Sequence, residues 1–295
     1  MKDFVILGDS TCDMDLQMRQ THNIDYIPMS YVVDEQEYPA SLDWQAHSVK
    51  EFYDLMRSGK RIFTAQINAN ICREKFRAAL EAGKDVVYIS CSSALSSSYQ
   101  SACVIAKEVE ESCPGGKIYC VDSLISSLGQ AHLLLEAAEQ RQAGKSARET
   151  AAYIESIRLK VNMMGYPGSL EYLRRAGRVK ASSAFFGNLF GVKPIIISDR
   201  QGNNYALKKV KGIGNARMAT AQMVAEAVTE ESKCLYIVHA DAPEEAEALR
   251  QAVMNLHSFE KVFVGNIGPI VGASVGPGMT GAFMLGKEVT IEGNE

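Results

Sequence analysis

Residues 85–102 read DVVYISCSSALSSSYQSA and predict a buried β-strand, a serine-rich turn and a helix in direct succession. Residues 85–89 contain no turn-forming residue and are rich in β-branched side chains, as is typical of a buried strand. Residues 102–111 have the spacing of an amphipathic helix. The connection between them, residues 90–98, is called the serine turn below. Its unpaired backbone N–H groups and the helix dipole favour an anion, although a plain turn with one serine as helix cap is the alternative.

The same alternation of strand and helix extends through the first half of the chain. Residues 4–7 and 117–121 are short apolar runs that predict further buried strands, and a long helix is expected from about Ser127 to Ala143. Short apolar strands separated by helices are typical of a mostly parallel sheet with helices on both faces. The sequence therefore predicts an α/β fold.

The second half of the chain contains a predicted hairpin and a glycine-rich, basic stretch that the first half lacks, so we expect a second α/β domain. Residues 199–204 predict a hairpin turn, and residues 205–210 its return strand. We place the boundary near residue 160, which gives an N-terminal domain of residues 1–160 and a C-terminal domain of residues 161–295.

Composition excludes several classes of protein. Hydrophobic residues make up 46% and charged residues 22% of the 295 residues, which is a globular balance. The net charge of −4 argues against a nucleic-acid-binding surface. Seven cysteines without metal-type spacing are typical of reduced, intracellular thiols. Gly8 and Asp9 interrupt the first apolar run, and no run has the length of a membrane span, so we expect a cytoplasmic protein without an integral membrane segment.

Polar residues follow two of the predicted strands. Asp9 and Ser10 come directly after the first strand, where parallel sheets place ligands, but the segment lacks the glycines of a nucleotide-binding loop. The alternative is that they cap the next helix. Asp122 ends a later strand, and we interpret it as a cap that supports the serine turn. Thr64 precedes another helix, where a threonine is more often a cap than a ligand contact.

Two stretches in the second half have unusual composition. Residues 170–179 end a predicted helix with three arginines, which suit a phosphate or carboxylate but also the helix dipole. The aromatic residues at 185–190 are expected either to line an apolar cavity or to belong to the core. Residues 267–281 are rich in glycine, which allows the backbone to approach a ligand closely. Their Gly-Pro steps predict tight turns, and their apolar character fits the wall of an apolar site.

Catalytic motifs are missing from the sequence. The five histidines show neither a triad nor a metal spacing, and no Gly-x-Ser-x-Gly elbow is present. Covalent catalysis is therefore disfavoured, and no metal or cofactor is expected.

Taken together, the motifs resemble the DegV family of bacterial fatty-acid-binding proteins, which includes the acyl-binding subunits of fatty acid kinase. The resemblance spans the whole chain, and it implies the EDD fold, in which two α/β domains bury a long-chain fatty acid between them. The motifs that carry it are Asp9-Ser10-Thr11, Thr64-Ala65-Gln66, residues 92–99, Val121-Asp122-Ser123, residues 173–179, Lys193-Pro194 and residues 275–278.

The resemblance also implies roles for individual residues. Thr64 and Ser96 would bind the fatty-acid carboxylate, and Ser92 and Ser93 would support the turn. Asp9 and Ser10 would support the same edge of the sheet. The remaining residues near the mouth of the site, where a kinase or an acyl phosphate is engaged, are Arg178, Lys211 and Ser274.

The chain departs from the family pattern at three places. Thr64 is followed by Ala-Gln-Ile instead of Ser-Gln-Pro, and residues 95–99 read LSSSY instead of LSGTY. Ser274 stands where kinase-coupled members often have a histidine. The resulting prediction is a binding protein, not itself an enzyme, that holds a long-chain fatty acid and presents it to a fatty acid kinase. The alternatives are a phosphotransferase or hydrolase that uses the serine turn and Arg178, and a docking protein whose arginines recruit a kinase.

Overall fold

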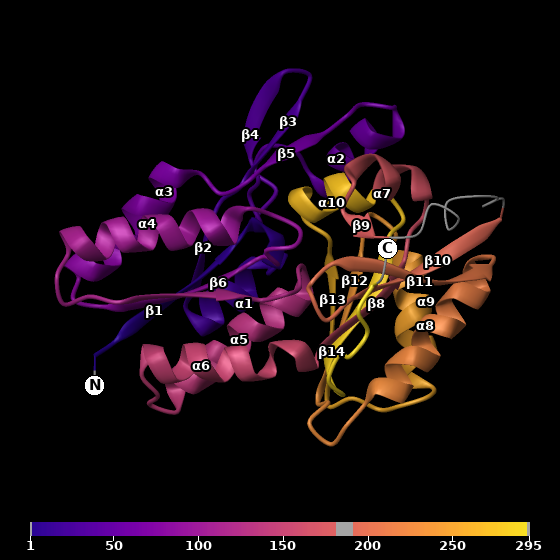
Figure 1. Cartoon of the computed structure of the whole chain (residues 1–295). Coiled ribbons are helices and arrows are strands. Elements are labelled where there is room, and N and C mark those ends of the chain that lie inside the picture. The colour runs from indigo at the N-terminus through magenta and orange to yellow at the C-terminus, as the bar shows by residue number, and fades with distance from the viewer. Residues whose placement is uncertain (1, 181–190, 294–295) are drawn as a thin grey trace.

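The first half of the chain is built around a four-stranded parallel sheet (Figure 1). The computed structural model describes residues 2–180 and 191–293. The strand order is β2-β1-β6-β7, and every neighbouring pair is parallel. This confirms the predicted parallel sheet. The strands are β1 (Phe4–Asp9), β2 (Ile24–Ile27), β6 (Asp85–Ser90) and β7 (Ile118–Asp122).

Helices cover both faces of this sheet, as the alternating pattern predicts. In Figure 1, α3 and α4 lie on one side of the sheet and α5 and α6 on the other, while α1 packs beside β2. Helix α4 begins four residues earlier than the sequence indicates, because the end of the serine turn forms its first turn. The helices are α1 (Leu16–His22), α3 (Ala69–Glu81), α4 (Ser98–Ser112), α5 (Leu128–Gln142) and α6 (Ala147–Ile157), with 3₁₀ turns at Ser10–Cys12 and Arg158–Lys160.

A seven-stranded mixed sheet forms the second half. Its order is β13-β12-β14-β8-β10-β11-β9, and β10 and β11 are the predicted hairpin. Helices α8 and α9 pack against one face, whereas α5 of the first half packs against the other. The elements are β8 (Val161–Tyr166), β9 (Val179–Lys180), β10 (Val192–Ser198), β11 (Asn204–Lys211), β12 (Cys234–His239), β13 (Lys261–Asn266), β14 (Thr280–Leu285), α8 (Ile213–Ala227) and α9 (Pro243–Met254).

Helix α5 lies between the two sheets and packs against strands of both. It begins after Ser127, which is buried and has a φ of +57°, a backbone conformation that residues with side chains rarely adopt. The Ser127 N–H donates to the Thr11 carbonyl at 2.7 Å. The start of α5 is thereby fixed to the end of β1.

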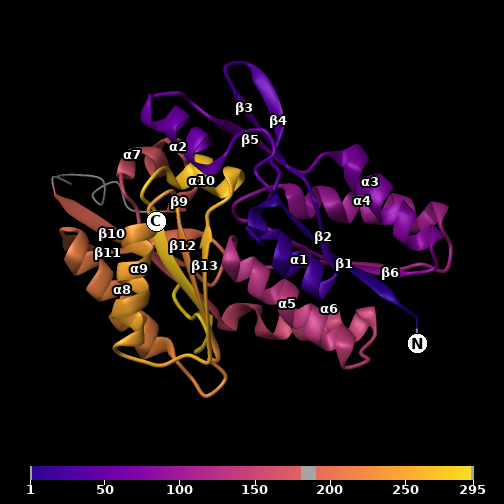
Figure 2. The same cartoon turned by 180° about the vertical axis from the view of Figure 1, so that it is seen from behind.

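A third group of elements lies across the top of the two sheets (Figures 1 and 2). It contains a small antiparallel sheet of order β4-β3-β5 and three helices. Its members are β3 (Ser30–Val33), β4 (Gln36–Pro39), β5 (Phe63–Ala65), α2 (Val49–Arg57), α7 (Leu170–Ala176) and α10 (Pro269–Val275).

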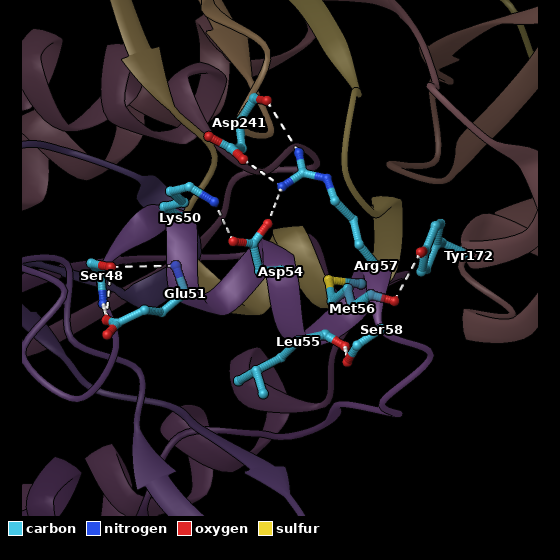
Figure 3. Close-up of polar contacts among 10 residues, drawn as sticks. All are labelled: Ser48, Lys50, Glu51, Asp54, Leu55, Met56, Arg57, Ser58, Tyr172 and Asp241. Atoms are coloured by element: carbon cyan, nitrogen blue, oxygen red, sulfur yellow. Dashed lines mark hydrogen bonds and ion pairs between the residues drawn. The ribbon is translucent and has the colours of Figure 1, made fainter.

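Helix α2 ties this group to the second half of the chain. Figure 3 shows its C-terminal Arg57 pointing to Asp241, with 2.6 Å between the Arg57 guanidinium and the Asp241 carboxylate. The Tyr172 hydroxyl of α7 donates to the Met56 carbonyl at 3.1 Å. The Tyr53 hydroxyl donates to the Ile267 carbonyl, just before α10, at 2.7 Å. Three separate contacts therefore hold the two halves together at this point.

The glycine-rich stretch 267–281 is only partly as predicted. Its first Gly-Pro step starts α10 rather than a tight turn, because proline is well suited to the first position of a helix. At Gly272 the backbone closely approaches another side chain of the same protein, since an added Cβ would lie 2.5 Å from the Tyr53 hydroxyl, and the expected approach to a ligand stays a prediction. Among the described residues, no helix is both long and apolar enough to cross a lipid bilayer.

Candidate functional site

A cavity of about 280 Å³ opens between the serine turn, β5 and α10. Its described lining contains one charged side chain, Arg178, and is otherwise neutral. Such a lining suits a ligand with a single negative charge, because one guanidinium group balances the charge and neutral groups donate the other hydrogen bonds. The lining residues are Thr11, Met29, Thr64, Ala65, Gln66, Cys91, Leu95, Ser96, Ser97, Ser126, Arg178, Asn204, Ile270, Val271, Ser274 and Val275.

Ser96 reaches the cavity because the serine turn folds back on itself. Its N–H donates to the Ser92 carbonyl at 3.1 Å, and its hydroxyl lies 2.9 Å from the Ser98 hydroxyl. The Ser98 hydroxyl in turn accepts a hydrogen bond of 3.3 Å from the Ile67 N–H. The serine turn is thus tied to the segment that carries Thr64.

Thr64 lies in the short strand β5 and lines the cavity opposite the serine turn. Its partner in the sheet is Tyr31 of β3. The interpretation of Thr64 as a helix cap is wrong, because Asn68 caps α3 by accepting from the N–H groups of Asn70 and Ile71. A strand of three residues is too short to stand out in a sequence pattern.

Asp9 and Ser10 lie behind the cavity and do not line it. The Asp9 carboxylate is fully buried and accepts hydrogen bonds from the N–H of Cys91 at 2.8 Å and of Thr11 at 3.0 Å. Asp9 caps only the short 3₁₀ turn that follows β1, whereas Asp15 caps α1, so the alternative that Asp9 and Ser10 cap the next helix is wrong. The Ser10 hydroxyl donates to the Ala40 carbonyl at 2.7 Å and accepts from the Met29 N–H at 2.9 Å. Both residues position strand ends.

Ser92 and Ser93 belong to the framework of the turn. The Ser92 hydroxyl is buried and donates to the Gly202 carbonyl, at 2.8 Å, in the β10–β11 hairpin. The Ser93 N–H donates to the Asp122 carboxylate at 3.0 Å, and Asp122 also accepts from the Leu124 N–H at 3.1 Å. Asp122 therefore supports the serine turn, in agreement with the sequence interpretation.

A second cavity, of about 340 Å³, adjoins the first and is strongly basic. Thr64, Arg178 and Ser274 line both cavities, and Arg61 and Arg175 line the second one. The described lining of this second cavity contains no acidic residue. Three guanidinium groups at the mouth favour a ligand or partner with negative charge. Lys211, at the end of β11, lines neither cavity.

An apolar channel continues from the first cavity toward the second sheet. Its free volume is about 30 Å³, and it shares part of its lining with the cavity. The shared residues are Ser126, Asn204, Val271 and Val275. The other lining residues are Ser127, Met163, Leu173, Ile196, Val238, Ile267, Met279, Gly281 and Phe283. The site as a whole is polar at one end and apolar at the other.

Several residues that line the cavity were not predicted from the sequence. Thr11 adjoins Asp9 and Ser10 in the same motif, so the motif itself was the available signal. Asn204 and Ser126 lie in segments that only the packing of the two halves brings to the site. Asn204 also donates a hydrogen bond of 3.2 Å to the carbonyl of Arg178. The aromatic residues at 185–190 lie outside the described residues.

The chemistry of the lining is limited by the side chains it contains. Neither cavity nor the channel has a histidine, aspartate or glutamate in its described lining, so no ordinary general base faces the serines there. Burial raises the pKa of the Cys91 thiol far above its usual range, so this cysteine is protonated and a poor nucleophile. The fold and the site thus define an α/β protein whose largely neutral, polar cavity continues into an apolar channel.

Comparison with known proteins identifies the family. A family model described as "Uncharacterised protein, DegV family" matches residues 3–287. The chain therefore belongs to the DegV family, which confirms the resemblance noted in its sequence. A DegV domain-containing protein of Clostridium perfringens is 29% identical over 287 residues, which cover 97% of this chain and 98% of the relative.

Solved structures have the same fold. A DegV family protein from Thermus thermophilus, described by its fatty acid binding, is 26% identical with a TM-score of 0.85, and the match covers 97% of this chain and 100% of that one. A stearic acid-binding protein from Eubacterium ventriosum has a TM-score of 0.87 at 22% identity, covering 96% and 98%. A DegV family protein from Eubacterium eligens loaded with heptadecanoic acid has a TM-score of 0.83 at 19% identity, covering 96% and 100%.

Proposed function

We propose that the protein binds a long-chain fatty acid between the two domains that we place at residues 1–160 and 161–295. The carboxylate binds at Thr64 and Ser96, and the acyl chain enters the apolar channel. The observation that carries this proposal is the continuity of a neutral-to-basic cavity with an apolar channel. The relative loaded with heptadecanoic acid and the stearic acid-binding relative support it.

The polar end of the site suits a carboxylate. Each neutral hydrogen bond adds about 0.5–1.5 kcal/mol, and a carboxylate that leaves water needs several of them. Thr64, Ser96 and neighbouring hydroxyls supply such donors, while Arg178 supplies one positive charge. This combination binds an anion without holding it irreversibly.

The acyl chain provides most of the affinity, since each buried methylene contributes about 0.8 kcal/mol. The channel has about 30 Å³ of free volume, so its side chains must shift to admit a chain. Met163 and Met279 line it, and the unbranched thioether side chain adapts readily to such shifts.

The kinase role rests on the second cavity. We propose that the basic mouth formed by Arg61, Arg175 and Arg178 receives a fatty acid kinase, which phosphorylates the carboxylate held at Thr64. Thr64 lines both cavities, so a head group bound there is accessible from the mouth. Charge reversal by Arg61→Glu with Arg175→Glu should abolish docking of a purified kinase subunit, whereas fatty-acid affinity should fall only modestly, and less at high salt, because neither arginine lines the first cavity. Arg148→Glu, on distant α6, is the control.

The test of the binding function uses native mass spectrometry and titration of purified, delipidated protein with palmitic acid. We expect a one-to-one complex that Val271→Trp abolishes, because Val271 lines both the cavity and the channel and the larger ring fills their junction. Absence of any bound or titratable fatty acid in the wild-type protein would overturn the proposal. Turnover of a model ester that Ser96→Ala abolishes would favour the hydrolase alternative instead.

A further inference from the structure

The segment that follows β14, residues 286–293, has no regular secondary structure and is called the C-terminal strap here. It runs from the end of β14 to the β10–β11 hairpin and is fixed by backbone hydrogen bonds on the way. The Val289 N–H donates to the Leu159 carbonyl at 2.7 Å, and the Ile291 carbonyl accepts from the Arg200 N–H at 2.8 Å. The strap is therefore held in place across the start of β8.

A cavity of about 220 Å³ lies beneath the C-terminal strap. Its walls are the strap, helix α8 and the adjoining parts of β8 and β10. Methionine, isoleucine and valine side chains form much of its surface. The described lining residues are Asn162, Met163, Met164, Ile197, Ser198, Met223, Glu226, Ala227, Lys287, Glu288, Val289, Thr290 and Ile291.

The polar groups of this cavity are bonded to the protein or exposed to water. The Asn162 amide donates to the carbonyls of Lys160 and Lys287 at 2.9 and 2.8 Å. The Lys287 ammonium group donates to the Glu226 carbonyl at 2.6 Å. Glu226 and Glu288 are both exposed residues. The enclosed part of the cavity therefore offers mainly apolar contacts, which suit a hydrocarbon chain.

The second sheet has a gap next to this cavity. Among the described residues, β8 and β10 are paired at only two positions, the last of which joins Ile197 to Met164. The residues that would pair next, Met163 and Ser198, do not pair with each other, and both line the cavity. Met163 packs in the core on the α5 side of the sheet, whereas Met164 packs in the core on the α8 side. The gap therefore lies between the two faces of the sheet.

Met163 also lines the apolar channel on the α5 side. It is the one residue that the described linings of the channel and of the strap cavity share. It does not line the first cavity, where the head group is proposed to bind, so it belongs to the end of the channel away from that group. Its unbranched thioether side chain changes conformation readily.

We propose that Met163 is a gate at the far end of the channel, and that the terminal methylenes of a long acyl chain pass it into the cavity beneath the C-terminal strap. This proposal rests on the fatty-acid site proposed above. The channel has about 30 Å³ of free volume and the strap cavity about 220 Å³, so the larger space lies beyond the gate. Each methylene buried there raises the affinity about fourfold, so the cavity favours long acyl chains over short ones.

Photolabelling of the wild-type protein locates the end of the chain directly. Delipidated, full-length protein is irradiated with a stearic acid analogue that carries a diazirine at its terminal carbon, and labelled peptides are mapped by mass spectrometry. We expect the label on Met223 and on residues 287–291. A label confined to channel residues such as Val238 and Phe283 would overturn the proposal and leave the fatty-acid function standing. Failure of stearic acid to bind at all would overturn both.

A filled strap cavity should discriminate between chain lengths. Met223 lines this cavity but neither the channel nor the first cavity, so Met223→Trp fills the space beyond the gate alone. We expect Met223→Trp to raise the Kd for stearic acid at least about tenfold, the value of roughly two methylenes, and to leave the Kd for lauric acid unchanged. Met218→Trp is the matched control, because Met218 is 52% exposed on the same helix. An equal change for both acids, or no change for stearic acid, would contradict the proposal.

Discussion

The Asp13 carboxylate accepts a hydrogen bond of 3.0 Å from the backbone N–H of Gly268, which precedes α10. An added Cβ at Gly268 would lie 2.5 Å from the same carboxylate oxygen, so the contact requires glycine. The other Asp13 oxygen accepts from the Ser127 hydroxyl at 2.5 Å. Helix α10 forms a wall of the cavity, so Asp13 fixes that wall to the end of β1.

Asp13 should make stability depend on pH. Burial raises its pKa from 3.8 to about 7, although the hydrogen bonds from Ser127 and Gly268 oppose this. Between these values the folded chain binds a proton that the unfolded chain has released. The resulting stabilisation is fully present below about pH 4 and is lost as the pH rises through about 7.

Asp13→Asn removes this titration, keeps an acceptor for Gly268 and tolerates the positive φ of 53° at this position. The free energy of unfolding of the wild type relative to the variant should therefore fall as the pH rises from 4 to 7, by at most about 1.4 kcal/mol per pH unit. Urea unfolding at pH 5, 6, 7 and 8 measures the difference. A difference that stays constant over this range would contradict the prediction.

Removal of a head-group hydroxyl should weaken fatty-acid binding. Thr64→Ala and Ser96→Ala each remove one neutral donor, which corresponds to a rise in Kd of about two- to tenfold. Titration with palmitic acid measures the change. Ser156→Ala is the matched control, because within the described residues its exposed hydroxyl donates only to the Tyr153 carbonyl on α6. Unchanged affinity in both site variants would show that the carboxylate binds elsewhere.

Arg178 should contribute a salt-dependent part of the affinity. Its side chain is exposed at the mouth and donates to the carbonyls of Leu95 and Ala176 at 3.3 and 2.8 Å. Arg178→Ala is expected to raise the Kd by about two- to fivefold at low ionic strength, and less at 0.5 M salt because exposed charges are screened. Arg148→Ala should have no effect at either ionic strength. An equal loss at both would indicate that Arg178 acts through packing instead of charge.

Gly276 should be a stability hot spot next to the site. Its φ is +73°, and an added Cβ would lie 2.2 Å from the Tyr172 ring, whose hydroxyl is tied to α2 (Figure 3). Gly276→Ala should lower the free energy of unfolding by about 2–4 kcal/mol. Gly214→Ala is the control, because no atom lies within 4 Å of its added Cβ. Thermal and urea unfolding compare the two, and equal stabilities would refute the strain argument.

Local patterns in the sequence were sufficient for the framework. The β-branched run that became β6 and the turn of the β10–β11 hairpin depend on neighbouring residues, so they were predicted correctly. The start of α4 was missed because serine has a low intrinsic helix propensity, whereas the contact of Ser98 with Ile67 holds this turn in place. Such a contact joins segments about thirty residues apart and leaves no periodic signal.

The candidate site was predicted in part for the same reason. Ser96, Thr64, Arg178 and Ser274 line the cavity, but the resemblance supplied them, not their spacing. Lys211 was expected at the mouth and lies outside both cavities. Asn204 lines the cavity and the channel, yet its place depends on how the hairpin packs against the serine turn. Packing between distant segments decides these positions.

The strained Ser127 shows how the α10 wall of the cavity is held in place before any ligand arrives. Its unusual backbone conformation costs about 1–3 kcal/mol, and glycine would relieve that strain. Glycine, however, has no hydroxyl to bond Asp13. The Ser127 hydroxyl therefore links α5 through Asp13 to α10. The strained backbone at Ser127 lowers the free energy of unfolding as a consequence. A wall held in this way is preorganised, so a ligand loses less conformational entropy in ordering it and has more of its contact energy left as affinity.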